Sequence, residues 1–319
     1  MSHSRPSFDS LPLRADGPPG NAWGLYGASD QLGTLNLLTP ARIAAAAAAE
    51  IRDGTRVPTD WPLDSMQPPA FGRQPFHHQI VHKWPPRPVN DDVVTFNTQS
   101  STQWDGFRHY GSADGRFYNG TTQEQIMTTD EMGTHAWVET GGIVGRGVLL
   151  DWAAWAERQD RKVDVHSSHA ITAAVLDEVA ASQGIAAFLP GDILFIRTGF
   201  TESYDRMAAE ARAALTKDYA PDSIGLESSR ETLRWLWDRG FAAVAGDQPA
   251  LEALPFPKHE HVLHEWLLPG WGMPIGELFS LKRLSEACAE KKRWTFFFTS
   301  MPIYVKGGVA SPPNGIAIF

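Results

Sequence analysis

Residues 98–109, TQSSTQWDGFRH, bring two amides, a carboxylate and an imidazole close together in the chain. The side chains concerned are those of Gln99, Gln103, Asp105 and His109. Carboxylates and imidazoles bind divalent metals, and the same groups transfer protons in acid–base catalysis. The segment therefore predicts a metal site or an acid–base pair, although a polar loop without chemistry would show the same spacing.

Further histidines and carboxylates lie far from this segment along the chain. They are His77, His78, His82, His166, His169, Asp247, His259, His261, His264 and Glu277. Metal sites assembled from separate loops have such scattered ligands, but a chain with 11 histidines also contains such groups by composition alone. Spacing by itself leaves both interpretations open.

Strands and helices alternate through most of the chain and must position these groups. Apolar runs predict strands at residues 79–81, 93–96, 147–151, 192–197, 241–247 and 294–305. Helical spacing of apolar residues predicts helices at residues 172–182, 202–215, 228–238 and 278–290. Thr39 and Pro40 begin an alanine-rich helix that we expect Gly54 to close. We expect one α/β domain over residues 1–319, including an irregular N-terminal arm at residues 1–38.

Composition and charge exclude several classes of protein. A net charge of −9 offers no basic stripe for nucleic acid. No run of about 18 apolar residues is present to span a membrane, and the N-terminus does not have the order of a signal peptide, so we expect a cytoplasmic protein. Glycine-rich phosphate loops are absent, which argues against a nucleotide cofactor. Cys288 has the helical spacing of a small buried residue.

Residues 99–109 resemble the motif HxGTHxDxPxH of the cyclase or kynurenine formamidase-like hydrolases. Aligned without gaps, Asp105 and His109 match the aspartate and the last histidine, whereas Gln99 and Gln103 replace the first two histidines. The resemblance extends to NAWGLYGASDQLGTLNLLTPARI, to RGVLLD and to PGDILFIRTGF, all typical of the longer members of the family. It implies a swivelling β/β/α domain, with a mixed sheet flanked by helices, that forms a homo-oligomer, either a dimer or a tetramer.

The same resemblance implies roles for particular residues. HEWLLPGWGMPIGELFSL is similar to the second ligand segment of the family, so Asp105, His264 and Glu277 are the implied ligands of a divalent ion. His109 is the implied acid–base residue, supported by Asp105. A glutamine offers only an amide oxygen, which suits Ca²⁺, Mg²⁺ or Mn²⁺ better than Zn²⁺. Gln99 and Gln103 are alternatively expected to orient Asp105 or to bind a substrate carbonyl.

The resemblance, together with these residues, implies a hydrolase that cleaves an amide, lactam, lactone or related acyl bond of a small aromatic or cyclic substrate. Activated water would attack the carbonyl, and Trp104 would contribute to an apolar substrate pocket. One alternative is a metal-independent dehydratase or cyclase that uses His109 and Asp105. A second alternative is a non-catalytic protein that binds small molecules.

Overall fold

The computed structural model describes residues 5–217, 219–258 and 261–319. Within these residues a 9-stranded sheet has the order β1-β13-β11-β5-β7-β9-β10-β4-β12. Its strands are β1 (Arg56–Pro58), β4 (Gln103–Asp105), β5 (Ile143–Asp151), β7 (Ile193–Arg197), β9 (Ala243–Gly246), β10 (Ile275–Glu277), β11 (Thr295–Ser300), β12 (Ala310–Ser311) and β13 (Ile316–Ile318). Two-stranded sheets pair β2 (His77–His82) with β3 (Asn90–Thr95), and β6 (Ala170–Ile171) with β8 (Gly225–Leu226).

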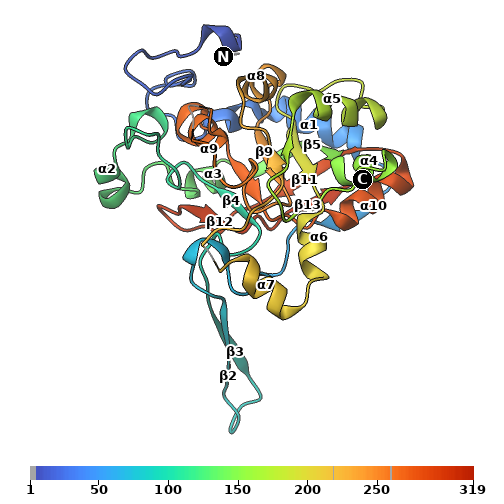
Figure 1. Cartoon of the computed structure of the whole chain (residues 1–319). Helices are drawn as coiled ribbons and strands as arrows, with labels where there is room; N and C mark the ends of the chain where they lie inside the picture. Colours follow the sequence, from blue (N-terminus) through green and yellow to red (C-terminus); the bar gives the residue numbers. More distant parts are fainter. Residues whose placement is uncertain (1–4, 218, 259–260) are drawn as a thin grey trace.

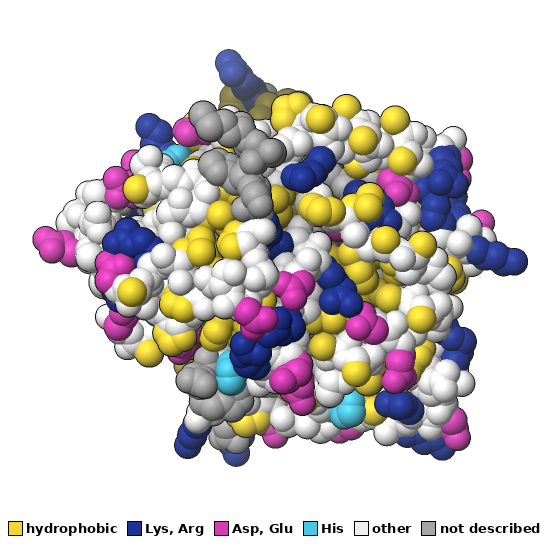
Figure 2. Space-filling model, turned by 90° about the horizontal axis from the view of Figure 1, so that it is seen from above, with side chains coloured by type: hydrophobic (Ala, Val, Ile, Leu, Met, Phe, Trp, Pro, Cys, Tyr) yellow, Lys and Arg dark blue, Asp and Glu magenta, His cyan; other side chains and the backbone are white. Residues whose placement is uncertain are grey.

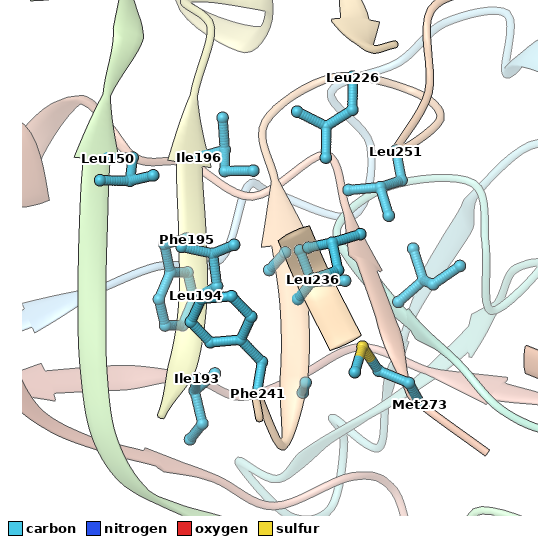
Figure 3. Packing of buried hydrophobic residues seen from close by; sticks show 14 of the residues in the cluster. Leu150, Ile193, Leu194, Phe195, Ile196, Leu226, Leu236, Phe241, Leu251 and Met273 are labelled. Carbon is cyan, nitrogen blue, oxygen red and sulfur yellow. The ribbon is translucent and has the colours of Figure 1, made fainter. Parts of the chain in front are cut away.

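The centre of the large sheet is parallel, and both of its sides are antiparallel. Strands β5, β7, β9 and β10 run parallel, while β11 pairs antiparallel with β5 and β4 pairs antiparallel with β10. A parallel strand is covered on both faces, which explains the continuous apolar runs of β7 and β9. Leu194 and Phe195 are fully buried in this core, and Figure 3 shows both among the other apolar side chains of the cluster.

Helices flank this mixed sheet, as the sequence predicts for an α/β fold (Figure 1). They are α1 (Pro40–Glu50), α2 (Gln123–Thr128), α3 (His135–Glu139), α4 (Trp152–Arg158), α5 (Ala173–Ser182), α6 (Phe200–Asp205), α7 (Ala209–Leu215), α8 (Arg230–Arg239), α9 (Leu263–Glu265) and α10 (Lys282–Lys291). Single turns of 3-10 helix form η1 (Phe8–Ser10), η2 (Gly33–Leu37), η3 (Ala70–Gly72) and η4 (Tyr118–Gly120), and Trp266–Trp271 forms a π-helical turn, η5.

Side chains at the helix starts explain several boundaries. Thr39, Thr172 and Ser229 each accept a hydrogen bond from the backbone N–H three residues later, so they cap α1, α5 and α8. Asp151 does the same for α4 directly at the end of β5. Helix α1 ends at Glu50, before Gly54, and the next residue, Ile51, is extended with a ψ of 107°. The buried Glu50 carboxylate pairs with Arg146 and Arg293.

The helix predicted at residues 202–215 is instead two helices, α6 and α7. The chain leaves the helical conformation at Ala208, whose ψ is 155°. This break allows Tyr204 of α6, Met207 and Leu215 of α7 to pack against one small apolar cluster around Trp61. The strand predicted at residues 294–305 also ends early, at Ser300.

Two exclusions made from composition can be compared with the structure. No helix among the described residues is long and apolar enough to cross a membrane. On the face shown in Figure 2, acidic and basic side chains are interspersed and neither sign forms a continuous stripe.

Cys288 is fully buried, and burial raises the pKa of its thiol, so the expectation of a small core residue is confirmed.

Candidate active site

Strand β4 carries the residues of the predicted site into the sheet. It lies between β10 and β12, and its register places Gln103 opposite Glu277 and Asp105 opposite Ile275. Directly opposed residues of an antiparallel pair share a face, and residues two apart on a strand also share it. Gln103, Asp105 and Glu277 therefore lie on one face, although Glu277 is 172 residues after Asp105 in the chain.

Trp104 lies on the opposite face of β4 and is not a substrate-pocket residue in this structure. Its indole is fully buried, packs edge-on against Phe279 with ring centroids 5.1 Å apart, and donates to Ser300 Oγ at 3.0 Å. The prediction for Trp104 is corrected by the alternation of a strand, because a residue between two site residues must point away from them.

Both glutamines donate hydrogen bonds to the carboxylate of Asp105. Gln99 Nε2 donates to Asp105 Oδ1 at 2.7 Å, and Gln103 Nε2 lies 3.4 Å from the same oxygen. Gln103 Nε2 also donates to Glu277 Oε2 at 2.8 Å. The glutamines thus orient Asp105, which is one of the two roles expected for them. Among the described residues, Asp105 Oδ2 and Gln103 Oε1 are buried without a hydrogen-bond partner.

His264 is held between two buried carboxylates. Glu252 Oε2 lies 2.7 Å from His264 Nδ1, and Glu252 Oε1 accepts the backbone N–H of His264 at 3.2 Å. Glu277 Oε1 lies 3.1 Å from His264 Nε2. Burial lowers the pKa of His264, but the charges of Glu252 and Glu277 outweigh burial and raise this pKa well above its usual value.

His109 differs from His264 in exposure and in protonation. Its side chain is 22 % exposed, and its Nε2 lies 3.9 Å from Asp105 Oδ2. Burial lowers the pKa of His109 despite the attraction of Asp105, which favours the neutral imidazole. The two histidines therefore favour opposite protonation states although their rings lie only 6.4 Å apart. Beside them, burial together with the neighbouring charge of Asp105 raises the pKa of Glu277 to about 7.

A cavity of about 370 Å³ opens onto these groups. Its polar side is formed by Arg73, Gln99, His109, His264 and Glu277, and its apolar side by Phe71, Tyr110, Tyr219, Ala220, Pro249, Ala250, Leu254, Pro255 and Phe256. Such a combination of an apolar wall with a few convergent polar groups is typical of a site for a small molecule.

The donor set suits a divalent metal ion. Asp105 Oδ2 has no partner and lies 3.9 Å from the Nε2 atoms of both His109 and His264. These three ligand atoms all lie within 4.8 Å of one another. Glu252 fixes Nδ1 of His264, so Nε2 is the nitrogen that faces the other ligands, as in many carboxylate–histidine–metal arrangements.

The ligand set expected from the sequence shares two members with this group. Asp105 and His264 belong to both sets, whereas the third member is Glu277 in the expected set and His109 in the structure. Glu277 is adjacent, with Oε1 3.1 Å from His264 Nε2. His109, His264 and Glu277 line the cavity, and Asp105 is fully buried next to them.

The other histidines and acids singled out in the sequence lie elsewhere. His78 pairs with Asp92 on the surface, and His166 Nε2 lies 3.0 Å from Ser203 Oγ. Asp247 is buried and accepts backbone N–H groups from Thr198 and Gly199, so its role is structural. His259 lies outside the described residues.

Comparison with known proteins places this arrangement in a family. Residues 33–253 match the family model Cyclase, described as "Putative cyclase". A crystal structure of a novel cyclase is similar over 94% of this chain and 99% of its own, with 31% identity and a TM-score of 0.82. The chain belongs to the cyclase family.

More distantly similar solved structures share the fold. Isatin hydrolase A from Labrenzia aggregata, solved with benzyl benzoate, is 17% identical with a TM-score of 0.56, over 89% of this chain and 98% of its own. Isatin hydrolase A from Ralstonia solanacearum is 18% identical with a TM-score of 0.57, over 87% and 95%. No curated protein matches the sequence.

Sequence reasoning missed two residues of this cyclase site. Glu252 lies in an irregular segment with no motif around it, and only the fold brings it to His264. Arg73 follows the single turn η3 in a proline-rich stretch, yet its guanidinium donates to the backbone oxygen of Gln99 at 2.6 Å. The sequence signal for Glu252 was a charged residue within the largely apolar segment QPALEALPF, because a charge buried with that segment needs a polar partner.

Proposed function

We propose that this member of the cyclase family hydrolyses an amide, lactam, lactone or related acyl bond of a small aromatic or cyclic compound. One observation carries the proposal: the buried, unpartnered Asp105 Oδ2 lies 3.9 Å from the Nε2 atoms of His109 and His264, and both histidines line a cavity with aromatic walls. The fold shared with the isatin hydrolases agrees with this chemistry.

His109 is the residue proposed to move protons. Of the four neighbouring side chains of the site it is the most exposed, at 22 %, whereas the Glu277 side chain is 3 % exposed and lies against His264. Its Nε2 would accept a proton from water while the water oxygen bonds to the substrate carbonyl carbon. The same proton would pass to the leaving nitrogen or oxygen as the acyl bond breaks, which leaves a carboxylic acid and an amine or alcohol.

If His109 transfers protons and is not itself a ligand, a divalent ion would be held by Asp105, His264 and Glu277. An ion bound there would supply Lewis-acid polarisation of a carbonyl and would lower the pKa of water. Glu252 would keep Nε2 of His264 directed at that position through its bond to Nδ1. Gln99 would fix the rotation of the Asp105 carboxylate, so that Oδ2 stays toward the cavity.

Arg73 is proposed to bind the oxygen that becomes negative during the reaction. It is the basic side chain of the cavity wall and is held over the Phe71 ring at 4.7 Å. One terminal N–H group of Arg73 donates to the backbone oxygen of Gln99, which fixes the guanidinium plane. The other N–H groups of the guanidinium remain as donors for a substrate oxygen. A preorganised donor of this kind stabilises an oxyanion more than it stabilises a neutral carbonyl.

A second candidate is a metal-independent dehydratase or cyclase that uses the same His109 and Asp105. The observation in its favour is that amide N–H groups of Gln99 and Gln103 already donate to Asp105 Oδ1. Hydrogen bonds of this kind stabilise a buried carboxylate without any ion. The two candidates differ in whether water is incorporated into the product.

A panel of N-formylated anilines, aromatic lactams and aromatic lactones tests the proposal. The wild-type protein should open at least one of these classes, and Asp105→Asn and His109→Ala should each lower kcat by about a hundredfold to ten-thousandfold. His169→Ala is the matched control, because His169 lies outside the cavity wall. Circular dichroism checks that each variant is folded. Wild-type turnover in a folded Asp105→Asn or His109→Ala variant, or no hydrolysis anywhere in the panel, would overturn it.

A further inference from the structure

Residues 219–223 join two parts of the cavity wall. At one end the backbone oxygen of Tyr219 accepts the N–H of Phe71 at 2.6 Å. At the other end the backbones of Ser223 and Leu254 are paired by hydrogen bonds of 3.0 and 3.4 Å. Phe71, Tyr219 and Leu254 all line the cavity. We call residues 219–223 the strap, because the segment is anchored at both ends beside the cavity.

Both residues of the first anchor have a backbone conformation that is unfavourable for a bulky side chain. Phe71 has a φ of 60° and Tyr219 has a φ of 80°. In this left-handed region the Cβ atom crowds the following carbonyl oxygen, so residues other than glycine, asparagine and aspartate rarely adopt it. Strained residues of this kind cluster at active sites and ligand clamps. Two aromatic rings are therefore held at the cavity in spite of a conformational cost.

The two rings differ in how firmly they are held. The Arg73 guanidinium lies over the Phe71 ring at 4.7 Å, and Phe71 also packs against the apolar cluster around Trp61. Tyr219 is 66% exposed. Its ring meets the Phe71 ring edge-on with centroids 5.8 Å apart, and a Cβ atom added at Gly72 would lie 3.6 Å from its Cε2 atom. Phe71 is thus the fixed ring, whereas the Tyr219 ring borders solvent and can rotate.

A second pair of rings lines the same cavity. Tyr110 and Phe256 have centroids 6.5 Å apart, and Phe256 also meets the His264 ring edge-on at 5.5 Å. Aromatic rings attract one another at centroid separations of about 4.5–7 Å, through contacts that a saturated ring cannot make. A planar ring bound beside His264 would have Phe256 on one side, and the pair of Phe71 and Tyr219 would complete its surroundings.

We propose that Tyr219 is a specificity-determining residue, which closes over the aromatic ring of the substrate while Phe71 forms the fixed face of the same clamp. The bound ring is the one carried by the substrate of the proposed hydrolysis, on which this role rests. The clamp goes beyond that reaction because it selects an aromatic ring over a saturated ring of equal size. The strained backbone of Tyr219 serves to place its ring at the cavity, where an unstrained residue would leave a gap in the wall.

Isothermal titration calorimetry with benzoate and cyclohexanecarboxylate tests the clamp without turnover. The two probes share one carboxylate and a ring of the same size, so the ratio of their Kd values isolates the aromatic contribution. The wild-type protein should bind benzoate more tightly, and Tyr219→Asn should reduce this preference by about twofold to tenfold. Tyr219→Phe should keep the preference because it keeps the ring. Tyr304→Asn is the matched control, since Tyr304 is 59% exposed and lies outside the cavity wall.

Thermal unfolding of the same variants separates the clamp from a role in packing. Asparagine adopts left-handed backbone more readily than tyrosine, so Tyr219→Asn should unfold at the same temperature as the wild type or at a higher one. A folded Tyr219→Asn variant with an unchanged preference for benzoate would overturn the proposal. A wild-type protein that binds neither probe, or binds both equally, would overturn it too. So would a lower unfolding temperature accompanied by an equal loss of affinity for both probes.

Kinetics on the aromatic panel separate the clamp from the proposed hydrolysis. Tyr219→Asn should raise KM for the best aromatic substrate by about twofold to tenfold and leave kcat unchanged, because the ring contact is the same in the ground state and the transition state. If no compound of the panel is cleaved while the preference for benzoate depends on Tyr219, hydrolysis is refuted and the clamp stands. If an aromatic substrate is cleaved while Tyr219→Asn changes neither KM nor the preference, the clamp is refuted and hydrolysis stands.

Discussion

Replacement of Glu252 by glutamine tests whether the negative charge next to His264 contributes to catalysis. Glu252 is fully buried and makes two contacts with His264, 2.7 Å to Nδ1 and 3.2 Å to the backbone N–H. Glutamine keeps the size and can still accept one hydrogen bond, so the main change is the loss of the negative charge. A hydrogen bond to a charged group contributes about 1.5–3 kcal/mol. A tenfold change in rate corresponds to about 1.4 kcal/mol, so kcat/KM should fall about tenfold to a hundredfold.

Steady-state kinetics on the best substrate of the panel measure this effect. Glu50→Gln is the matched control, because Glu50 is also buried and pairs with Arg146 and Arg293, and none of the three lines the cavity. Glu50→Gln should lower the midpoint of thermal unfolding and leave kcat/KM unchanged. A Glu252→Gln variant with wild-type kcat/KM would refute the role assigned to Glu252, whatever its thermal stability.

Two further predictions concern substrate charge and stability. Arg73→Gln should lower kcat by about tenfold to a thousandfold with a smaller change in KM, because Arg73 is assigned to the oxyanion; an increase in KM alone would contradict this assignment. Burial raises the pKa of Asp192 from 3.8 to about 6, so in the folded state this carboxyl binds a proton more tightly than in the unfolded state. Its contribution to stability, about 3 kcal/mol, is complete below pH 3.8 and is lost as pH rises through about 6. In denaturant unfolding from pH 4 to pH 7, the free energy of unfolding of the wild type should fall by about 3 kcal/mol more than that of Asp192→Asn, and parallel curves would contradict this contribution.

The parallel core could be predicted because its sequence pattern is local. Three apolar runs gave strands β5, β7 and β9 within a few residues, since buried parallel strands are apolar along their whole length. The break between α6 and α7 could not be predicted, because it depends on packing against Trp61, which is far away in the chain. Tertiary contacts override helical spacing there.

The site was predicted in part for a similar reason. Asp105, His109, His264 and Glu277 were predicted as site residues because a family motif carries them, and in the structure the four side chains lie next to one another. Trp104 was assigned wrongly because proximity in sequence was taken for proximity in space, although neighbours on a strand face opposite ways. Glu252 has no motif, and its contact with His264 exists only in the folded chain.

Turnover in water enriched in oxygen-18 tests the central claim most directly. The account predicts that one heavy oxygen enters the new carboxyl group of the product, and that Asp105→Asn and His109→Ala lower the rate of labelled product formation together. Mass spectrometry of the product measures the label, and an uncatalysed control in the same water corrects for exchange. Enzymatic turnover without heavy oxygen in the product would contradict hydrolysis and would favour the dehydratase or cyclase instead.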